Sequence, residues 1–186
     1  QIAANFSRTR VNMWPEVLPY IQQIAPNSSV LDLGCGNGRL INSLPNQINY
    51  LGIDFSDGLI KEARRIHTDS NFLRADITTI RLKENYDAIC CLAVLHHLPL
   101  DQQLIVMKII KEHLNPNGLA IITVWDLKQE KYGSFVKGDR ALIPFEGIDR
   151  ACFVHSLNSF KNLAKEAGFE HVKGEQTKGN LILELS

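Results

Sequence analysis

A glycine-rich turn between an apolar run and the next helix contains the residue types in this sequence that most clearly suggest chemistry. Glycine lets a backbone turn tightly and approach a ligand where a β-carbon would collide with it. The apolar run at 30–33 just before the turn is typical of a parallel strand covered on both faces. We therefore predict a ligand pocket at the carboxyl end of this strand. The residues of the turn are Asp32, Gly34, Cys35, Gly36, Asn37 and Gly38.

The spacing of the glycines indicates which ligand the turn would hold. A dinucleotide fold needs Gly-x-Gly-x-x-Gly, but here the third glycine, Gly38, comes one residue early and Arg39 follows it. Asp54 ends the next apolar run, where a doubly wound fold places a carboxylate for ribose hydroxyls. The spacing thus predicts an adenosine ligand without a diphosphate. The alternative is a plain strand-to-helix turn with a capping aspartate.

The elements that would position these groups alternate along the chain. Such alternation requires parallel strands joined by right-handed crossovers. A turn is expected at 115–118, where the sequence is Asn-Pro-Asn-Gly. We expect helices at 13–24, 39–44, 57–67 and 101–113, and strands at 30–33, 49–53, 71–73, 86–92 and 119–124.

The end of the chain breaks this alternation. After a helix at 156–167, apolar runs at 169–175 and 180–185 lie too close for a helical crossover, so they must form a hairpin. The predicted fold class is therefore α/β. It is a doubly wound, Rossmann-like sheet of about seven strands, mostly parallel with an antiparallel C-terminal hairpin strand, and with helices on both faces.

Composition bounds the remaining possibilities. The chain of 186 residues is 45% hydrophobic, which suits a single domain over 1–186 with a substantial core. It has 20 basic and 20 acidic residues, so it lacks the basic excess of a stand-alone nucleic-acid binder. The cysteines lack zinc-type spacing, and no apolar run is long enough to span a bilayer. We expect buried thiols, a cytoplasmic location, no signal peptide and no membrane contact.

The set of motifs resembles the class I S-adenosylmethionine-dependent methyltransferases along most of the chain. Their acidic strand and glycine turn match 32–38, their ribose acid matches Asp54, and their fourth-strand motif matches 86–97. The resemblance implies S-adenosylmethionine as cofactor. It also implies that Asp76 and the Ile77 backbone meet the adenine, with Gly34, Leu92 and Ala93 at the methionine end. Phe55 would either stack near the adenine or pack in the core.

A narrower resemblance is to the tRNA wobble-uridine carboxymethyl methyltransferases, seen in 2–15, 33–38, 94–97 and 124–125. It implies tRNA as substrate and, as in several eukaryotic members, a small partner subunit. A carboxylate acceptor needs no general base, since its pKa of about 4 leaves it ionised at neutral pH, but it needs a cation. The residues that could position it are Arg10, Arg140, Arg150 and His155. The alternative for each of them is a solvated surface charge.

This sequence departs from that family in two respects. The arginine and tyrosine-rich segment expected before the last helix is kept only loosely at 150–155, and the basic surface for a tRNA is missing. A small-molecule acceptor is therefore the alternative substrate. A catalytically silent cofactor-binding scaffold is another alternative. A nucleotide-dependent oxidoreductase is disfavoured by Arg39.

Two further segments are expected to serve the site. Residues 1–28 would form an N-terminal lid and helix, and 126–152, which lacks clear periodicity, would be a loop that covers the substrate. The alternatives are a frayed polar terminus for the first segment and a flexible loop without such a role for the second. His97, beside His96, leaves the fourth strand where the methyl group should point, so it is a candidate base or orienting group. Capping and packing is the alternative role. We expect no metal site, because adjacent histidines should point apart and no third ligand is apparent.

Overall fold

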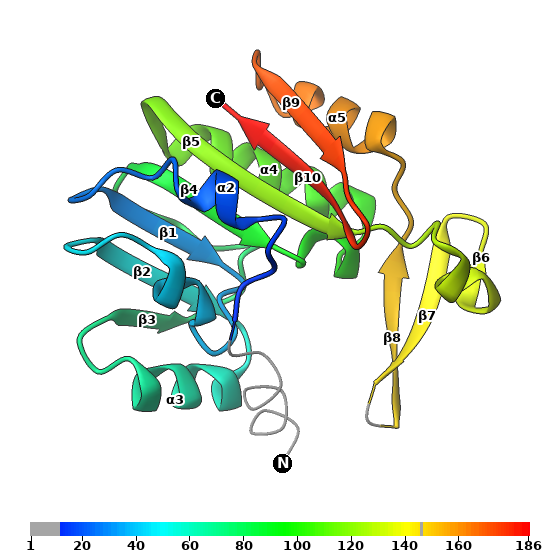
Figure 1. The fold of residues 1–186 in the computed structure, drawn as a ribbon, viewed down its shortest axis with the longest axis horizontal. Coiled ribbons are helices and arrows are strands. Elements are labelled where there is room, and N and C mark those ends of the chain that lie inside the picture. Colours follow the sequence, from blue (N-terminus) through cyan, green and yellow to red (C-terminus); the bar gives the residue numbers. More distant parts are fainter. Residues whose placement is uncertain (1–11, 146) are drawn as a thin grey trace.

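The computed structural model describes residues 12–145 and 147–186, and strands alternate with helices through most of them (Figure 1). Residues 1–11 of the predicted N-terminal lid and helix, including Arg10, lie outside the described residues. The strands of the main sheet are β1 (Ser29–Leu33), β2 (Asn49–Asp54), β3 (Asn71–Arg74), β4 (Tyr86–Leu92), β5 (Leu114–Trp125), β9 (Val172–Gln176) and β10 (Asn180–Leu185). The α-helices are α2 (Leu18–Ile21), α3 (Asp57–Ile66), α4 (Leu100–His113) and α5 (Leu157–Glu166). Short 3₁₀ helices are η1 (Arg39–Ser43), η2 (Leu95–His97) and η3 (Glu130–Phe135).

The main sheet has seven strands in the order β3-β2-β1-β4-β5-β10-β9. Pairing is parallel from β3 to β5, whereas β10 pairs antiparallel with both β5 and β9. The predicted fold class, including the antiparallel C-terminal hairpin, is therefore confirmed. The order reverses between β1 and β4, and in such sheets ligands bind outside the carboxyl ends of the strands at that point.

Two apolar layers cover the two faces of the sheet. One contains Val106 and Met107 of α4 together with Phe160 of α5. The other contains Ile21 of α2, Leu40 of η1 and Ile60 of α3. These buried faces hold the sheet rigid, and so fix the positions of the loops at its carboxyl edge.

Three expected elements differ from the observed ones. The first helix is limited to Leu18–Ile21, because Pro19 lacks the N–H that an earlier helical turn would need. The segment after the glycine turn is a 3₁₀ helix, Arg39–Ser43, that ends at an extended Leu44 before Pro45. The predicted turn at 115–118 lies inside β5, where the pairing with β4 shifts register.

The segment 126–152 is the largest difference, since it is not a loop. It forms a second, three-stranded antiparallel sheet of β6 (Val136–Lys137), β7 (Arg140–Phe145) and β8 (Ile148–Phe153). This sheet projects beyond the end of β5 in Figure 1 and has its own apolar core around Leu127, Ile143 and Cys152. We call 126–153 the insertion sheet. Among the described residues, none of the helices combines the length and apolar character that crossing a membrane requires.

Candidate functional site

The glycine turn is held against the end of β2 by its own backbone. The N–H groups of Gly34 and Cys35 both donate to the carbonyl oxygen of Ile53, at 2.7 and 3.0 Å. Gly34 has a φ of +74°, and a β-carbon there would lie 2.3 Å from a methyl group of Val94. The turn therefore needs glycine at this position for both its conformation and its space. With no side chain at Gly34, the backbone of the turn faces a cavity at the carboxyl edge of the sheet.

Asp54 shapes the same turn from the neighbouring strand. Its carboxylate accepts hydrogen bonds from the backbone N–H of Gly36 at 3.0 Å and of Ser56 at 2.9 Å. Burial raises the pKa of this carboxyl, and hydrogen bonds from the backbone of Ser56, Gly36 and Phe55 act against that shift. A carboxylate can accept about four hydrogen bonds in all, so Asp54 retains capacity for a ligand hydroxyl.

Asp32 places a second carboxylate in the cavity. It is buried and accepts a hydrogen bond from the hydroxyl of Tyr50 at 2.8 Å. Burial raises the pKa of Asp32 to about 7, against the lowering effects of the Tyr50 hydrogen bond and of the positive charge of Arg39. Two carboxyl groups in one glycine-walled cavity suit a ligand that carries both hydroxyls and positive charge.

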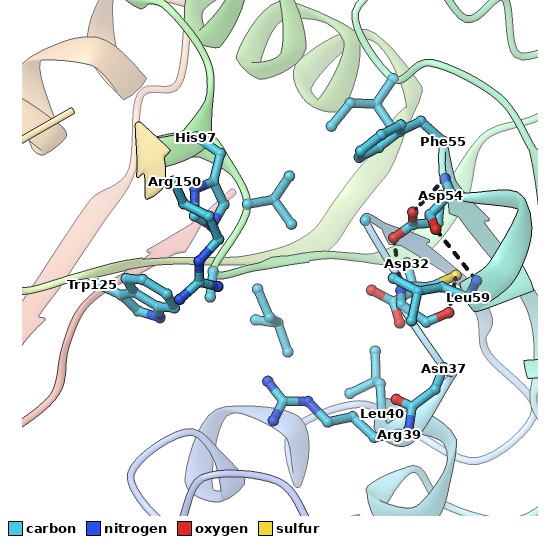
Figure 2. A pocket seen from close by; sticks show the side chains of 18 of the residues that line it. Asp32, Asn37, Arg39, Leu40, Asp54, Phe55, Leu59, His97, Trp125 and Arg150 are labelled. Atoms are coloured by element: carbon cyan, nitrogen blue, oxygen red, sulfur yellow. Dashed lines mark hydrogen bonds between the residues drawn. The ribbon is translucent and has the colours of Figure 1, made fainter. Parts of the chain in front are cut away.

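The cavity itself has a volume of about 1360 Å³, which exceeds the roughly 300–1000 Å³ of a pocket for one drug-sized ligand. Figure 2 shows Asp32 and Asp54 on one side of it, with His97, Trp125 and Arg150 on the other. Thirteen of the predicted site residues line it. They are Asp32, Gly34, Cys35, Gly36, Asn37, Asp54, Phe55, Asp76, Ile77, Leu92, Ala93, His97 and Arg150.

The side of the cavity that holds the glycine turn, Asp32 and Asp54 is called the nucleoside half here, after the ligand expected there, and its rim includes Asp76 and Phe55. The Asp76 carboxylate accepts hydrogen bonds from the N–H and hydroxyl of Thr78, both at 2.8 Å. Phe55 is 75% exposed, so it does not pack in the core and offers a free ring face beside Asp54. Gly38 does not line the cavity, and a β-carbon there would lie 2.9 Å from the His67 ring. Its role is to turn the chain.

The other half of the cavity, which we call the acceptor half, joins the insertion sheet to the ends of β4 and β5. Its walls include Trp125, Tyr132 and Phe145. The Arg150 guanidinium lies 4.4 Å from the ring centroid of Phe145 and 4.9 Å from that of Trp125. Burial lowers the pKa of Arg150, and its Nε is buried without a hydrogen-bond partner in the described part of the chain. This geometry presents a planar cation to whatever occupies the acceptor half.

The structure separates the other predicted cations from this site. Arg140 is exposed on β7, where its guanidinium lies 5.3 Å from the ring of Phe153, and it does not line the cavity. His155 is buried and lines a different, smaller pocket between α4 and α5. Arg150 is therefore the one of the four candidates that the described residues bring to the cavity.

His96 and His97 do not point apart as expected. Their ring centroids are 4.1 Å from one another, and Cys152 of β8 lies beside them with its Sγ 3.4 Å from His97 Nδ1. The reasoning against a metal site was thus wrong, because the insertion sheet supplies a third potential ligand. Burial lowers the pKa of His97 to about 4, so its imidazole is neutral at pH 7.

Sequence reasoning missed one contact in the cavity wall. The guanidinium of Arg39 lies 3.9 Å from the ring centroid of Trp14, and both residues line the cavity. The two residues are far apart in the sequence, and no periodic pattern connects them. Only the packing of the N-terminal segment on the main sheet brings them together.

Comparisons with known proteins identify the family of this chain. Residues 8–173 match a family described as a methyltransferase domain. The chain is 35% identical over 156 residues to the tRNA (carboxymethyluridine(34)-5-O)-methyltransferase of Saccharomyces cerevisiae, covering 83% of this chain and 53% of that protein. It is 36% identical over 135 residues to the Arabidopsis thaliana protein of the same name, covering 69% and 32%. The chain thus spans about half or less of the length of these relatives.

Solved structures show the same fold at lower sequence identity. An S-adenosylmethionine-dependent methyltransferase from Clostridium acetobutylicum superposes with a TM-score of 0.77 at 13% identity, covering 98% of this chain and 96% of that one. The CcbJ methyltransferase from Streptomyces caelestis also reaches 0.77, at 15% identity and with 100% and 95% coverage. At these identities the likeness describes the fold alone.

Proposed function

This chain belongs to the methyltransferase domain family, and from that premise we propose that it transfers a methyl group from S-adenosylmethionine to the carboxymethyl group of a tRNA wobble uridine. The product would be a methyl ester. The names of the relatives from yeast and Arabidopsis support this choice of substrate. The cavity supports it independently, because it has room for two ligands and a cation in the acceptor half.

The residues of the nucleoside half fit the cofactor. Asp54 would accept hydrogen bonds from the ribose hydroxyls, and the buried Asp32 would favour the cationic methionine end. Asp76 and Ile77 would meet the adenine edge, and the open backbone at Gly34 leaves room for the ligand. When bound, S-adenosylmethionine supplies an electrophilic methyl group on a sulfonium.

Arg150 is the observation that carries the choice of acceptor. It is a cation in an aromatic-walled cavity, and no ion pair to it occurs among the described residues. A substrate carboxylate would complete the guanidinium's hydrogen bonds, and the aromatic walls of the cavity would suit a planar base. An amine or a neutral hydroxyl acceptor would leave this charge unmatched.

The remaining task of the protein is to align the acceptor carboxylate with the methyl group of the cofactor. A carboxylate with a pKa of about 4 is ionised at neutral pH, so no side chain would have to remove a proton before a carboxylate oxygen bonds to the methyl carbon and S-adenosylhomocysteine leaves. With one oxygen held by Arg150, the other would be free to approach the methyl carbon from the side opposite the sulfur. His97, neutral at pH 7, would help to orient the acceptor and not act as an essential base.

The test is transfer of a tritiated methyl group to purified tRNA that carries the 5-carboxymethyl group at the wobble uridine. The same tRNA without that group is the control, and the free carboxymethylated nucleoside is the second substrate. We expect label in the first tRNA only, released as methanol by mild base because the product is an ester. The reaction is run with and without candidate small partner proteins, since a partner subunit remains a prediction.

Several results would contradict the proposed methyl acceptor. Label that resists base, or that appears in both tRNAs, would mean that the methyl group goes elsewhere. Label in a pool of small carboxylic acids but not in tRNA would favour the small-molecule alternative. Binding of S-adenosylhomocysteine without transfer to any of these would favour a scaffold.

A further inference from the structure

Two histidines and a cysteine gather where the insertion sheet meets the turn after β4. His96 and His97 belong to η2, and Cys152 lies on β8, 55 residues further along the chain than His97. One potential ligand atom from each of the three lies within 4.8 Å of the other two. The cluster therefore depends on the tertiary structure and has no counterpart in the spacing of the sequence.

The separations suit a tetrahedral ion. Zinc binds thiolate sulfur at about 2.3 Å and imidazole nitrogen at about 2.0–2.1 Å, which places two such ligands about 3.6 Å apart. Cys152 Sγ and His97 Nδ1 are 3.4 Å apart. The ligand atom of His96 lies within 4.8 Å of the other two, so it would have to approach them by at most about 1.5 Å to complete the set.

His96 supplies the observation that points to a ligand. Its side chain is fully buried, and its Nε2 has no hydrogen-bond partner in the described part of the chain. Its Nδ1 accepts a long hydrogen bond of 3.4 Å from the backbone N–H of Trp125. Zinc binding through Nε2 would break this weak bond, because the ring proton would then move to Nδ1. A buried polar atom left without a partner costs free energy, and most such atoms in native proteins are satisfied.

We propose that His96, His97 and Cys152 bind a zinc ion through two imidazole nitrogens and one thiolate, with water in the fourth position. Mixed nitrogen and sulfur ligands favour zinc over magnesium or calcium, and three protein ligands plus water is a common zinc arrangement. The Cys152 thiol releases its proton to solvent as the sulfur–zinc bond forms. His97 lines the main cavity, which gives the ion a route from solvent.

The ion would tie the insertion sheet to the main sheet. Cys152 lies two residues after Arg150 on β8, and its thiol also approaches the Arg150 carbonyl oxygen at 3.7 Å. A bond from η2 through zinc to Cys152 would hold that stretch of β8 in place and so fix Arg150 in the acceptor half. The site does not depend on the identity of the methyl acceptor.

The test uses the reduced, metal-depleted full chain and Co²⁺ as a spectroscopic probe, followed by displacement with Zn²⁺. We expect one equivalent of Co²⁺ to give visible bands of a tetrahedral site and a near-ultraviolet thiolate band. Cys152→Ala should abolish the thiolate band, and Cys90→Ala, which removes another fully buried thiol, should retain it. Calorimetric binding of S-adenosylhomocysteine checks that each variant is folded, and needs no methyl transfer.

Affinity for Zn²⁺ provides the second readout. Loss of a residue that merely orients a metal ligand weakens binding about 10–100-fold, so His97→Gln should weaken it at least that much. His171→Gln, which alters an exposed histidine, should not. Absence of the thiolate band in the unaltered chain, or its survival in folded Cys152→Ala, would overturn the proposal. So would equal Zn²⁺ affinity in the two histidine variants.

Discussion

The Asp54 carboxylate accepts a hydrogen bond from the backbone N–H of Gly36 at 3.0 Å, which links the end of β2 to the turn after β1. The two strands are neighbours in the sheet. One side chain therefore both holds the glycine turn in shape and faces the cavity where ribose would lie. A change at Asp54 should therefore affect both the binding of the ligand and the conformation of the glycine turn.

Replacing Asp54 with alanine should weaken binding of S-adenosylhomocysteine. Ribose hydroxyls would lose a charged acceptor, a loss of about 1–3 kcal/mol, or roughly 5–150-fold in Kd. Isothermal calorimetry measures the change. Asp57→Ala, which removes an exposed carboxylate at the start of α3, is the control and should bind as the unaltered chain does. Equal affinity in the two variants would contradict the ribose assignment.

Gly34→Ala should destabilise the fold. The new methyl group would lie 2.3 Å from a Val94 methyl group, in a left-handed backbone conformation with φ +74°. Strain of this kind costs about 1–3 kcal/mol. Urea unfolding measures it, and adding Val94→Ala should recover the part that comes from the collision but not the part that comes from φ. A fully stable Gly34→Ala chain would show that the turn does not require glycine.

Arg150→Gln should lower turnover while leaving cofactor affinity unchanged. Hydrogen bonds to charged groups contribute about 1.5–3 kcal/mol, so we expect at least a tenfold loss in kcat/KM. Arg140→Gln is a matched control, because that arginine lies outside the cavity on the neighbouring strand. Similar losses in both variants would mean that surface charge, and not a specific clamp, holds the substrate.

Cofactor binding should depend on pH through Asp32. Its pKa is raised from 3.8 to about 7, so in the free protein a fraction is protonated and uncharged at neutral pH. A cationic ligand binds better to the carboxylate, so affinity should rise as pH increases through about 7 and level off above it, by about tenfold overall between pH 6 and 8.

The ligand's own amine also titrates in this range, so the informative quantity is the affinity of the unaltered chain relative to Asp32→Asn. The asparagine variant keeps an acceptor for the Tyr50 hydroxyl but cannot ionise. We expect this ratio to increase with pH. A ratio that stays constant from pH 6 to 8 would show that Asp32 does not change its charge there.

The main sheet could be predicted because its strands are nearly continuous apolar runs. The strand Tyr86–Leu92 and the C-terminal strand Asn180–Leu185 begin and end where the pattern indicated. The insertion sheet could not, since exposed Leu142 and Ile148 break the alternation of apolar and polar residues, and Pro144 lies within a strand. In these strands tertiary packing, and not periodicity, decides the structure.

The two halves of the site also differ in how far the local sequence predicts them. The nucleoside half is encoded in local motifs, so Gly34 and Asp54 could be selected from sequence, although their roles as ligand contacts remain predictions. The acceptor half depends on contacts between distant segments. The pairing of Arg150 with Trp125, and of Cys152 with His97, appears only when β8 lies against η2.

The insertion sheet is one continuous stretch of chain with an apolar core of its own around Ile143 and Cys152. On the proposed function, changes within it would therefore alter the choice of acceptor without disturbing the two apolar layers of the main sheet. Substrate choice would then be adjustable in this one segment, while the main sheet keeps the methyl donor.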